Sequence, residues 1–318
     1  MSLPALTAVI CFANEGEEVE ITVQGLRDTC GDDIDILLIN DASDDGRDYE
    51  TVADRYGCRY LLNENQIGPA HSRHKGASWA KTENVIFLDA HMRFYERGWH
   101  IIVNEMIAQN PTTLFCTKSK PLKPGGEPSG APTGHGASMI FMADDFNAAL
   151  KPDWNIYPLE GAGPAYVPCV LGGNYAVNRD FFLSIGGYRG LHRYGGEEAL
   201  ISIKTWLAGG NCQLIRDVEI GHIYRDGRGA PWKDKVKYFH FNKLATAEIL
   251  FDAQERAPYF KLLDALPEGK SAKQVFDSRR SFVHGARKVF QSVKRHPMAY
   301  FHELNDAFRH KESITPKA

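Results

Sequence analysis

A carboxylate and an imidazole stand two residues apart in the sequence, as Asp89 and His91. Because alternate residues of an extended segment project to the same side, both side chains could reach one divalent cation. His222, which follows a short apolar segment, is a plausible third ligand. A purely structural interpretation also exists, in which Asp89 caps the next turn and His91 packs against Trp99. The residues alone leave both interpretations open.

The chain before Asp89 alternates between short apolar runs and segments of helical periodicity. We expect strands over residues 8–12, 34–39, 58–62 and 85–88, and helices over 17–30, after Arg47 and over 68–80. Strands and helices that alternate at this spacing predict a parallel sheet covered by helices on both faces.

Polar residues follow three of these expected strands: Asn14-Glu15, the segment 40–46 and Asp89-Ala90-His91. Ligands of open α/β sheets bind beyond the carboxyl ends of the strands. The three polar segments are therefore expected around a single crevice.

The second half of the sequence is less regular. Gly, Pro and Ser are frequent over residues 118–136, which predicts a surface loop. We expect strands over 175–177 and 217–220, a helix over 197–207, and a mainly helical segment over 235–256. Phe276, Val283 and Phe290 then recur every seven positions among many basic residues, which predicts an amphipathic helix.

Composition indicates a folded protein with one large core, since 43% of the 318 residues are hydrophobic. A formal net charge of −3 gives no overall attraction for nucleic acid. The six cysteines are scattered without a C-x-x-C pair, which favours reduced thiols. We see neither a basic leader nor an apolar segment of membrane-spanning length, so we expect a cytoplasmic protein. The basic C-terminal helix either contacts the inner membrane surface or packs on the rest of the protein.

Seven segments of this chain occur in the order seen in family 2 glycosyltransferases. They are residues 9–15, 40–45, 68–76, 88–91, 172–174, 194–198 and 221–225. In detail they resemble the polypeptide N-acetylgalactosaminyltransferases, which share a D-x-H metal motif, a W-G-G-E-N block and a G-H-V-F-R block. The resemblance implies a GT-A fold, with a Rossmann-like, mostly parallel central sheet flanked by helices. It implies a catalytic domain over residues 1–230, with a nucleotide half at about 1–115 and an acceptor half at about 116–230. Residues 231–318 would form a loop and a helical C-terminal extension.

The same resemblance implies a hexosyl- or N-acetylhexosaminyltransferase that uses a UDP-sugar donor and Mn²⁺ or another divalent cation. The implied metal ligands are Asp89, His91 and His222. The implied nucleotide-binding residues are Phe12, Glu15, Asp41, Arg73 and Asp89. The implied sugar-binding residues are Gly172, Gly173, Tyr194 and Glu197, and the implied catalytic residues are Glu197, Glu198 and Arg225. The acceptor is not indicated.

Three positions depart from the closest resemblance: Tyr194 replaces a tryptophan, Glu198 an asparagine and His71 an arginine. The pair Glu197-Glu198 also resembles the E-D block of other family 2 enzymes, in which an acid is the general base of an inverting displacement. Without such a base, the closer resemblance implies retention. The sequence leaves both stereochemical outcomes open.

Two other functions deserve comparison with glycosyl transfer. A sugar nucleotidyltransferase would have a glycine-rich, basic phosphate loop after the first strand, whereas residues 12–18 are acidic. A nucleotide-sugar or glycan-binding module would keep the fold without turnover, and the complete set of ligand and acidic residues disfavours that alternative.

Overall fold

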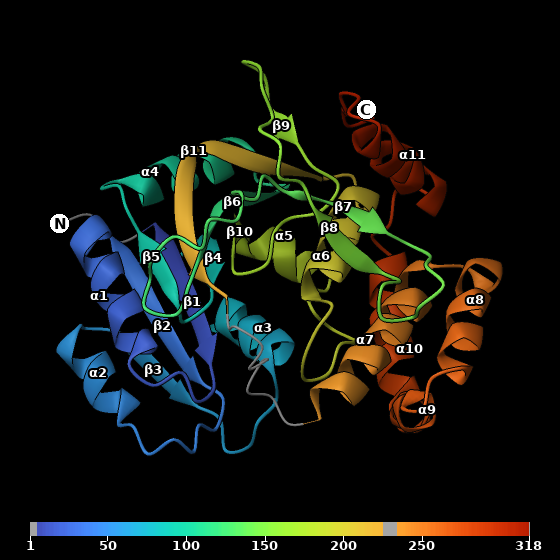
Figure 1. Ribbon diagram of the computed structural model, residues 1–318, viewed down its shortest axis with the longest axis horizontal. Helices are drawn as coiled ribbons and strands as arrows, with labels where there is room; N and C mark the ends of the chain where they lie inside the picture. The colour runs from blue at the N-terminus through green and yellow to red at the C-terminus, as the bar shows by residue number, and fades with distance from the viewer. Residues whose placement is uncertain (1–4, 225–233, 318) are drawn as a thin grey trace.

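The computed structural model describes residues 5–224 and 234–317. Within these residues, a nine-stranded sheet has the order β3-β2-β1-β4-β10-β6-β11-β5, and β9 pairs with β11 (Figure 1). The first strands are β1 (Leu6–Phe12), β2 (Ile34–Asn40), β3 (Arg59–Leu62), β4 (Asn84–Leu88) and β5 (Met92–Phe94). The later strands of the sheet are β6 (Thr113–Leu122), β9 (Ala165–Tyr166), β10 (Asn174–Asn178) and β11 (Asn211–Ile223). The predicted α/β class, a central sheet flanked by helices, is confirmed.

The first four strands in the sheet order, β3, β2, β1 and β4, are parallel. Every residue of β1 is buried, because its alternate side chains enter cores on opposite faces of the sheet. Val9 and Cys11 belong to one core, and Ala8, Ile10 and Phe12 to the other. The helices of this half are α1 (Glu18–Cys30), α2 (Tyr49–Arg55), α3 (Pro69–Trp79) and α4 (Trp99–Gln109).

The second half of the sheet is mixed. Strand β10 is antiparallel to both β4 and β6, whereas β11 is parallel to β6 and antiparallel to β5. Two predictions need correction here: β6 extends through Lys118 to Leu122, into the expected loop, and β11 is much longer than the expected strand. An irregularity between Ile215 and Glu219 divides β11, and so its two parts do not read as one continuous apolar alternation. The helices here are α5 (Arg179–Ser184) and α6 (Glu197–Leu207), and a separate hairpin pairs β7 (Ala137–Ile140) with β8 (Lys151–Trp154).

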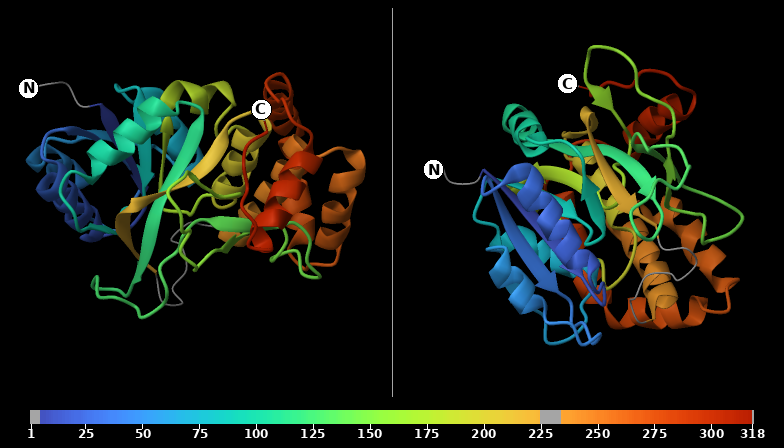
Figure 2. Two further views of the ribbon diagram at one scale, coloured as in Figure 1. Left: turned by 90° about the horizontal axis from the view of Figure 1, so that it is seen from above. Right: turned by 60° about the vertical axis from the view of Figure 1, so that its left-hand side comes forward.

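Helices at the C-terminal end lie on the side of the molecule away from α1 and α2 (Figure 2). They are α7 (Lys235–Leu250), α8 (Ala253–Asp264), α9 (Gly269–Ser278), α10 (Arg280–Gln291) and α11 (Met298–Arg309). Of these helices, α7 and α11 pack on α6. The single amphipathic helix expected around Phe276, Val283 and Phe290 is two helices, α9 and α10, which meet at Arg279. These three apolar side chains are buried in the core that also contains residues of α3, α6 and α7. This burial agrees with the expectation that the C-terminal helix packs on the rest of the protein. No described helix is long and apolar enough to cross a membrane.

Candidate active site

A cavity of about 410 Å³ lies beyond the carboxyl ends of β1 and β4. Its walls come from the start of α3, the segment before β10, the start of α6, the end of β11 and one side chain of α7. The three polar segments expected at one crevice do not all contribute. Glu15 and Asp89-Ala90-His91 line the cavity, whereas the segment 40–46 does not.

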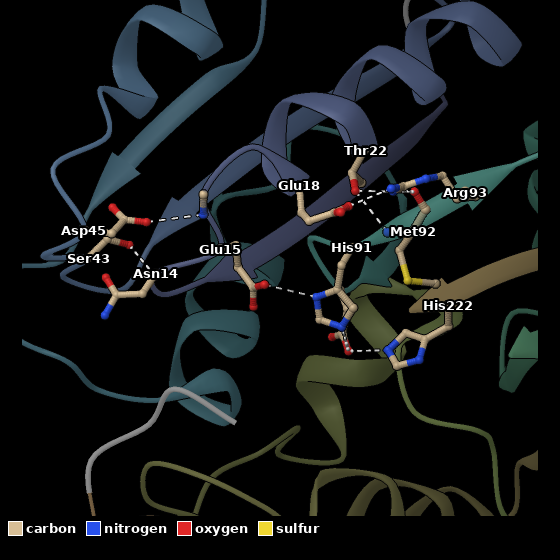
Figure 3. Close-up of polar contacts among 12 residues, drawn as sticks. Asn14, Glu15, Glu18, Thr22, Ser43, Asp45, His91, Met92, Arg93 and His222 are labelled. Atoms are coloured by element: carbon tan, nitrogen blue, oxygen red, sulfur yellow. Dashed lines mark hydrogen bonds and ion pairs between the residues drawn. The ribbon is translucent and has the colours of Figure 1, made fainter. Parts of the chain in front are cut away.

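Asp89, His91 and His222 converge at this cavity. Strand β11 places His222 opposite Met92 of β5, and the Ile223 amide donates to the His91 carbonyl at 3.1 Å. The Nε2 atom of His222 lies 3.1 Å from Asp89 Oδ2, and the Nε2 atom of His91 lies 3.8 Å from the same oxygen. One potential ligand atom from each residue lies within 4.8 Å of the other two. Figure 3 shows the imidazoles of His91 and His222 side by side, and their ring centroids are 4.9 Å apart.

Charge and burial favour the protonation states of Asp89 and His222 that bind a cation. Burial raises the pKa of Asp89, but the buried Arg73 guanidinium, 2.5 Å from Oδ1, outweighs it and holds the pKa well below its usual range. Burial lowers the pKa of His222, although its contact with Asp89 opposes the shift. An ionised carboxylate and neutral imidazole are the forms that bind metals. The donor set therefore fits a divalent cation such as Mn²⁺.

Neighbouring residues fix the orientation of these ligands. Glu15 Oε2 lies 3.3 Å from His91 Nδ1, the ring nitrogen that faces away from Asp89 (Figure 3). A carboxylate in this position orients an imidazole ligand and raises its basicity. Gly173 has a φ of +92°, and a Cβ added there would lie 3.0 Å from His222 Cδ2. Glycine at this position therefore leaves room for the His222 ring.

Two glutamates begin α6 on the other side of the cavity. Gly196, in the left-handed conformation, precedes them and turns the chain into the helix. Glu197 is only 3% exposed, and its Oε1 atom has no hydrogen-bond partner among the described residues. Burial and the neighbouring Glu198 raise the pKa of Glu197 to about 7. Glu198 lies against Gly172, where an added Cβ would be 2.8 Å from Glu198 Oε1. The site therefore combines three potential metal ligands with an acid that can exchange a proton near neutral pH.

Comparison with known families identifies the N-terminal part of this arrangement. The family model described as glycosyl transferase family 2 matches residues 7–127, which include β1, β4 and the Asp89-Ala90-His91 segment. Residues 7–127 form a family 2 glycosyltransferase domain. The division of the catalytic domain into a nucleotide half and an acceptor half stays a prediction.

Curated relatives of the glycosyltransferase domain extend the similarity beyond residue 127. N-acetylgalactosaminyltransferase 6 of Drosophila melanogaster is 30% identical over 277 residues, covering 81% of this chain and 40% of that protein. Polypeptide N-acetylgalactosaminyltransferase 5 of Caenorhabditis elegans is 25% identical over 281 residues, covering 83% of this chain and 44% of the relative. The chain thus spans less than half the length of these curated relatives.

Solved structures confirm the predicted GT-A fold. The crystal structure of GalNAc-T7 with UDP, GalNAc and Mn²⁺ has a TM-score of 0.71 and 22% identity. That similarity covers 99% of this chain and 59% of the other. The structure of S. aureus TarS 1-349 in complex with UDP-GlcNAc has a TM-score of 0.55 and 11% identity. It covers 98% of this chain and 93% of the other.

Asp41 does not line the cavity of the glycosyltransferase domain, and its predicted contact with the nucleotide stays a prediction. Its carboxylate is fully buried and accepts hydrogen bonds from the amides of Ile67 and Gly68, at 2.9 and 2.7 Å, and from the side chains of Asn63 and Ser72, at 2.7 and 3.3 Å. Both carboxylate oxygens are thus occupied by the protein. Asp41 supports the turn that begins α3, the helix that carries Arg73.

Phe12 does not line the cavity either, and its predicted contact with the nucleotide also stays a prediction. Its side chain is buried and packs on Tyr49, with ring centroids 4.7 Å apart, on the face of the sheet opposite α3. Cys11 lines the cavity in its place, because adjacent strand residues point to opposite faces. Among the other predicted nucleotide contacts, Glu15, Arg73 and Asp89 line the cavity, and so do the predicted sugar contacts Gly172, Gly173, Tyr194 and Glu197. Arg225 lies outside the described residues.

Three aromatic residues of the cavity are absent from the sequence prediction: Trp154, Tyr224 and Phe239. Trp154 and Tyr224 pack edge to face with centroids 5.6 Å apart, and Tyr224 also contacts the His222 ring at 4.4 Å. Tyr224 lies two residues after His222, and this spacing in a strand is the one available signal for it. Trp154 and Phe239 come from the hairpin and from α7, whose docking no local pattern reveals.

Proposed function

We propose that this chain is a metal-dependent glycosyltransferase that uses a UDP-sugar donor. One observation carries the proposal: the cluster of Asp89, His91 and His222 shares a cavity with two acidic residues at the start of α6. The names of the curated relatives support transfer of a sugar, and the GalNAc-T7 structure contains UDP, GalNAc and Mn²⁺.

The residues of the cavity have separate roles in this proposal. When bound, the metal ion neutralises the charge of the leaving diphosphate as a Lewis acid. Arg73 keeps Asp89 ionised and orients it toward the two imidazoles. Gly172 and Gly173 permit close approach of the donor sugar, because they have no side chain to fill the cavity. We assign Glu197 to the sugar or to the acceptor hydroxyl, and Arg225 to closure over the diphosphate.

Glu197 has two possible roles with different products. If it removes the proton of the acceptor hydroxyl during direct displacement, the sugar is transferred with inversion. If it only accepts a hydrogen bond, transfer through a short-lived ion pair retains the configuration. Proton NMR of freshly formed product distinguishes the two roles, because the anomeric coupling reports the configuration directly.

The proposal is tested by measuring hydrolysis and transfer with UDP-sugars, with Mn²⁺ and with EDTA. Asp89→Asn and His222→Ala should abolish turnover while preserving the fold. Asp35→Asn is the matched control for the first variant, since Asp35 pairs with Arg59 outside the cavity. His100→Ala controls for the second, since His100 is buried in α4. Undiminished turnover in both cavity variants would exclude the metal assignment, and UDP-sugar binding without turnover in the unmodified protein would indicate a binding module.

We also propose that the protein resides in the cytoplasm. The free state of all six cysteines supports this, because none is paired in a disulfide. A peripheral membrane contact of the C-terminal helices would depend on basic side chains, since their apolar stripe is buried. Cell fractionation tests the location. Salt-sensitive sedimentation with anionic vesicles tests the contact.

A further inference from the structure

A group of basic and aromatic side chains lies beside the cavity and has no role in the proposed reaction. We name it the basic cluster and define it by His71, His192, Arg193, Tyr238, Arg279 and Phe282. The His71 ring lies 5.5 Å from the His192 ring and 6.0 Å from that of Phe282. The Arg193 guanidinium lies 5.0 Å from the centroid of the Tyr238 ring, which also packs edge to face on His192 at 5.1 Å. The cluster therefore joins four parts of the fold: α3, the loop before α6, α7 and the α9–α10 junction.

The basic cluster is directly connected to the wall of the cavity. Arg193 precedes Tyr194 in the chain and Tyr238 precedes Phe239, and Tyr194 and Phe239 both line the cavity. The loop that carries Arg193 packs tightly on the start of α3, because a Cβ at Gly68 would lie 2.2 Å from Arg193 Cα. The basic cluster therefore adjoins the part of the cavity wall that Tyr194 and Phe239 form.

The positive charge of the cluster comes from Arg193 and Arg279. Burial lowers the pKa of His192 to about 3, and Arg279, His71 and Arg193 lower it further. Burial and Arg279 also lower the pKa of His71, against the opposing effect of Asp41. Both oxygens of Asp41 are already occupied by hydrogen bonds within the protein. The potential at the cluster therefore favours an anion.

Two nitrogen atoms of the cluster also lack partners. His192 Nδ1 and Arg193 Nε are buried, and neither has a hydrogen-bond partner in the described part of the chain. Buried polar atoms without partners are uncommon in folded proteins and indicate an absent ligand or water. Arginine donors form strong, charge-assisted hydrogen bonds with phosphate and carboxylate oxygens.

We propose that the basic cluster binds an anionic group, phosphate or carboxylate, on the acceptor while the reacting hydroxyl lies in the cavity near Glu197. This assignment rests on the proposed function and adds the chemical class of the acceptor. Arg193 and Arg279 supply the permanent charges, and the aromatic rings of Tyr238 and Phe282 flank the anion. An acceptor without negative charge loses these contacts.

The test measures binding by calorimetry without donor and with EDTA, so that the metal-dependent donor site makes no contribution. The probes are glucose 6-phosphate, glucuronate and glucose, and comparison of the first two distinguishes phosphate from carboxylate. We expect an anionic probe to bind and glucose not to bind. Arg193→Gln and Arg279→Gln should each weaken binding about tenfold, the effect of losing one charge-assisted hydrogen bond. Arg280→Gln is the matched control, because Arg280 is exposed and pairs with Asp277. Thermal melting checks that each variant folds.

Three results would overturn the assignment. The first is failure of both anionic probes to bind the unmodified protein. The second is equal binding by the Arg193 and Arg279 variants and the Arg280 control. The third is displacement of the bound probe by UDP together with weaker Mn²⁺–UDP binding in the Arg193 variant, which would place the cluster in the donor site. Absence of UDP-sugar turnover with intact, arginine-dependent probe binding would instead refute the proposed function and support the anion site.

Discussion

Substituting Gly173 with alanine should weaken metal binding without unfolding the protein. At this position a Cβ would lie 3.0 Å from His222 Cδ2 and 3.4 Å from Asp89 Oδ2. The His222 ring must therefore move by a few tenths of an ångström. Gly173 also has a φ of +92°, so alanine adds strain of about 1–2 kcal/mol to the folded state. Displacement of a ligand by a supporting residue typically lowers metal affinity about 10–100-fold, which is the loss we expect for Mn²⁺.

Gly161 provides the matched control for this prediction. Its φ is +110°, but a Cβ there would meet nothing within 4 Å. Gly161→Ala should therefore share the backbone strain, measured as a lower free energy of unfolding in urea, and retain normal Mn²⁺ affinity. Calorimetric titration with Mn²⁺ in the presence of UDP measures the affinity of both variants. If Gly173→Ala binds Mn²⁺ as tightly as Gly161→Ala, the geometric reasoning about His222 is wrong.

Three further predictions concern other parts of the site. Burial raises the pKa of Glu197 from 4.5 to about 7, so its protonated form stabilises the fold; this stability is complete below pH 4.5 and is lost as pH rises through 7. In urea unfolding, the free energy of unfolding of the unmodified protein should fall by on the order of 3 kcal/mol over this pH range, and Glu197→Gln should remove that fall. The same pH profile in both proteins would contradict the assigned pKa shift. Asn242 of α7 accepts from the His192 amide at 2.7 Å and donates to the carbonyls of Tyr194 and Gly195, at 3.0 and 2.7 Å. Asn242→Ala should thus reduce kcat for transfer about tenfold or more and leave Mn²⁺ affinity intact, whereas equal loss of both would indicate general unfolding. Asp41→Asn should lower the free energy of unfolding by about 1–3 kcal/mol, because an amide cannot accept all of the hydrogen bonds to the turn before α3. An unaffected stability would contradict the assigned role of Asp41 in holding this turn.

Local sequence patterns predicted much of the fold. The helix over 197–207 coincides with α6, because left-handed Gly196 precedes it and two acids fill its first turn. The strand that ends before Asp89 was clear from its continuous apolar run, as buried parallel strands usually are. The length of β11 could not be predicted, since the irregularity after Ile215 interrupts its alternation. The break between α9 and α10 at Arg279 could not be predicted either, because the seven-residue spacing of apolar side chains continues across it.

The site was only partly predictable for a related reason. Asp89, His91 and His222 have residue types that bind metals, and their motif made them recognisable. Asp41 has an equally suitable carboxylate, but its side chain turns inward to the amides of Ile67 and Gly68. A sequence does not show whether a polar side chain is already satisfied by nearby backbone groups. The contribution of Phe239 depends on how α7 docks, which is a property of the tertiary fold.

The most direct test of the metal-held donor is a crystal of the protein grown with Mn²⁺ and UDP, measured near the manganese absorption edge. We predict one anomalous peak within ligand distance of Asp89, His91 and His222 and in contact with the diphosphate. The same crystal of the His222→Ala variant should show a weakened or absent peak. Ordered UDP in the cavity without manganese at these three residues would contradict the account.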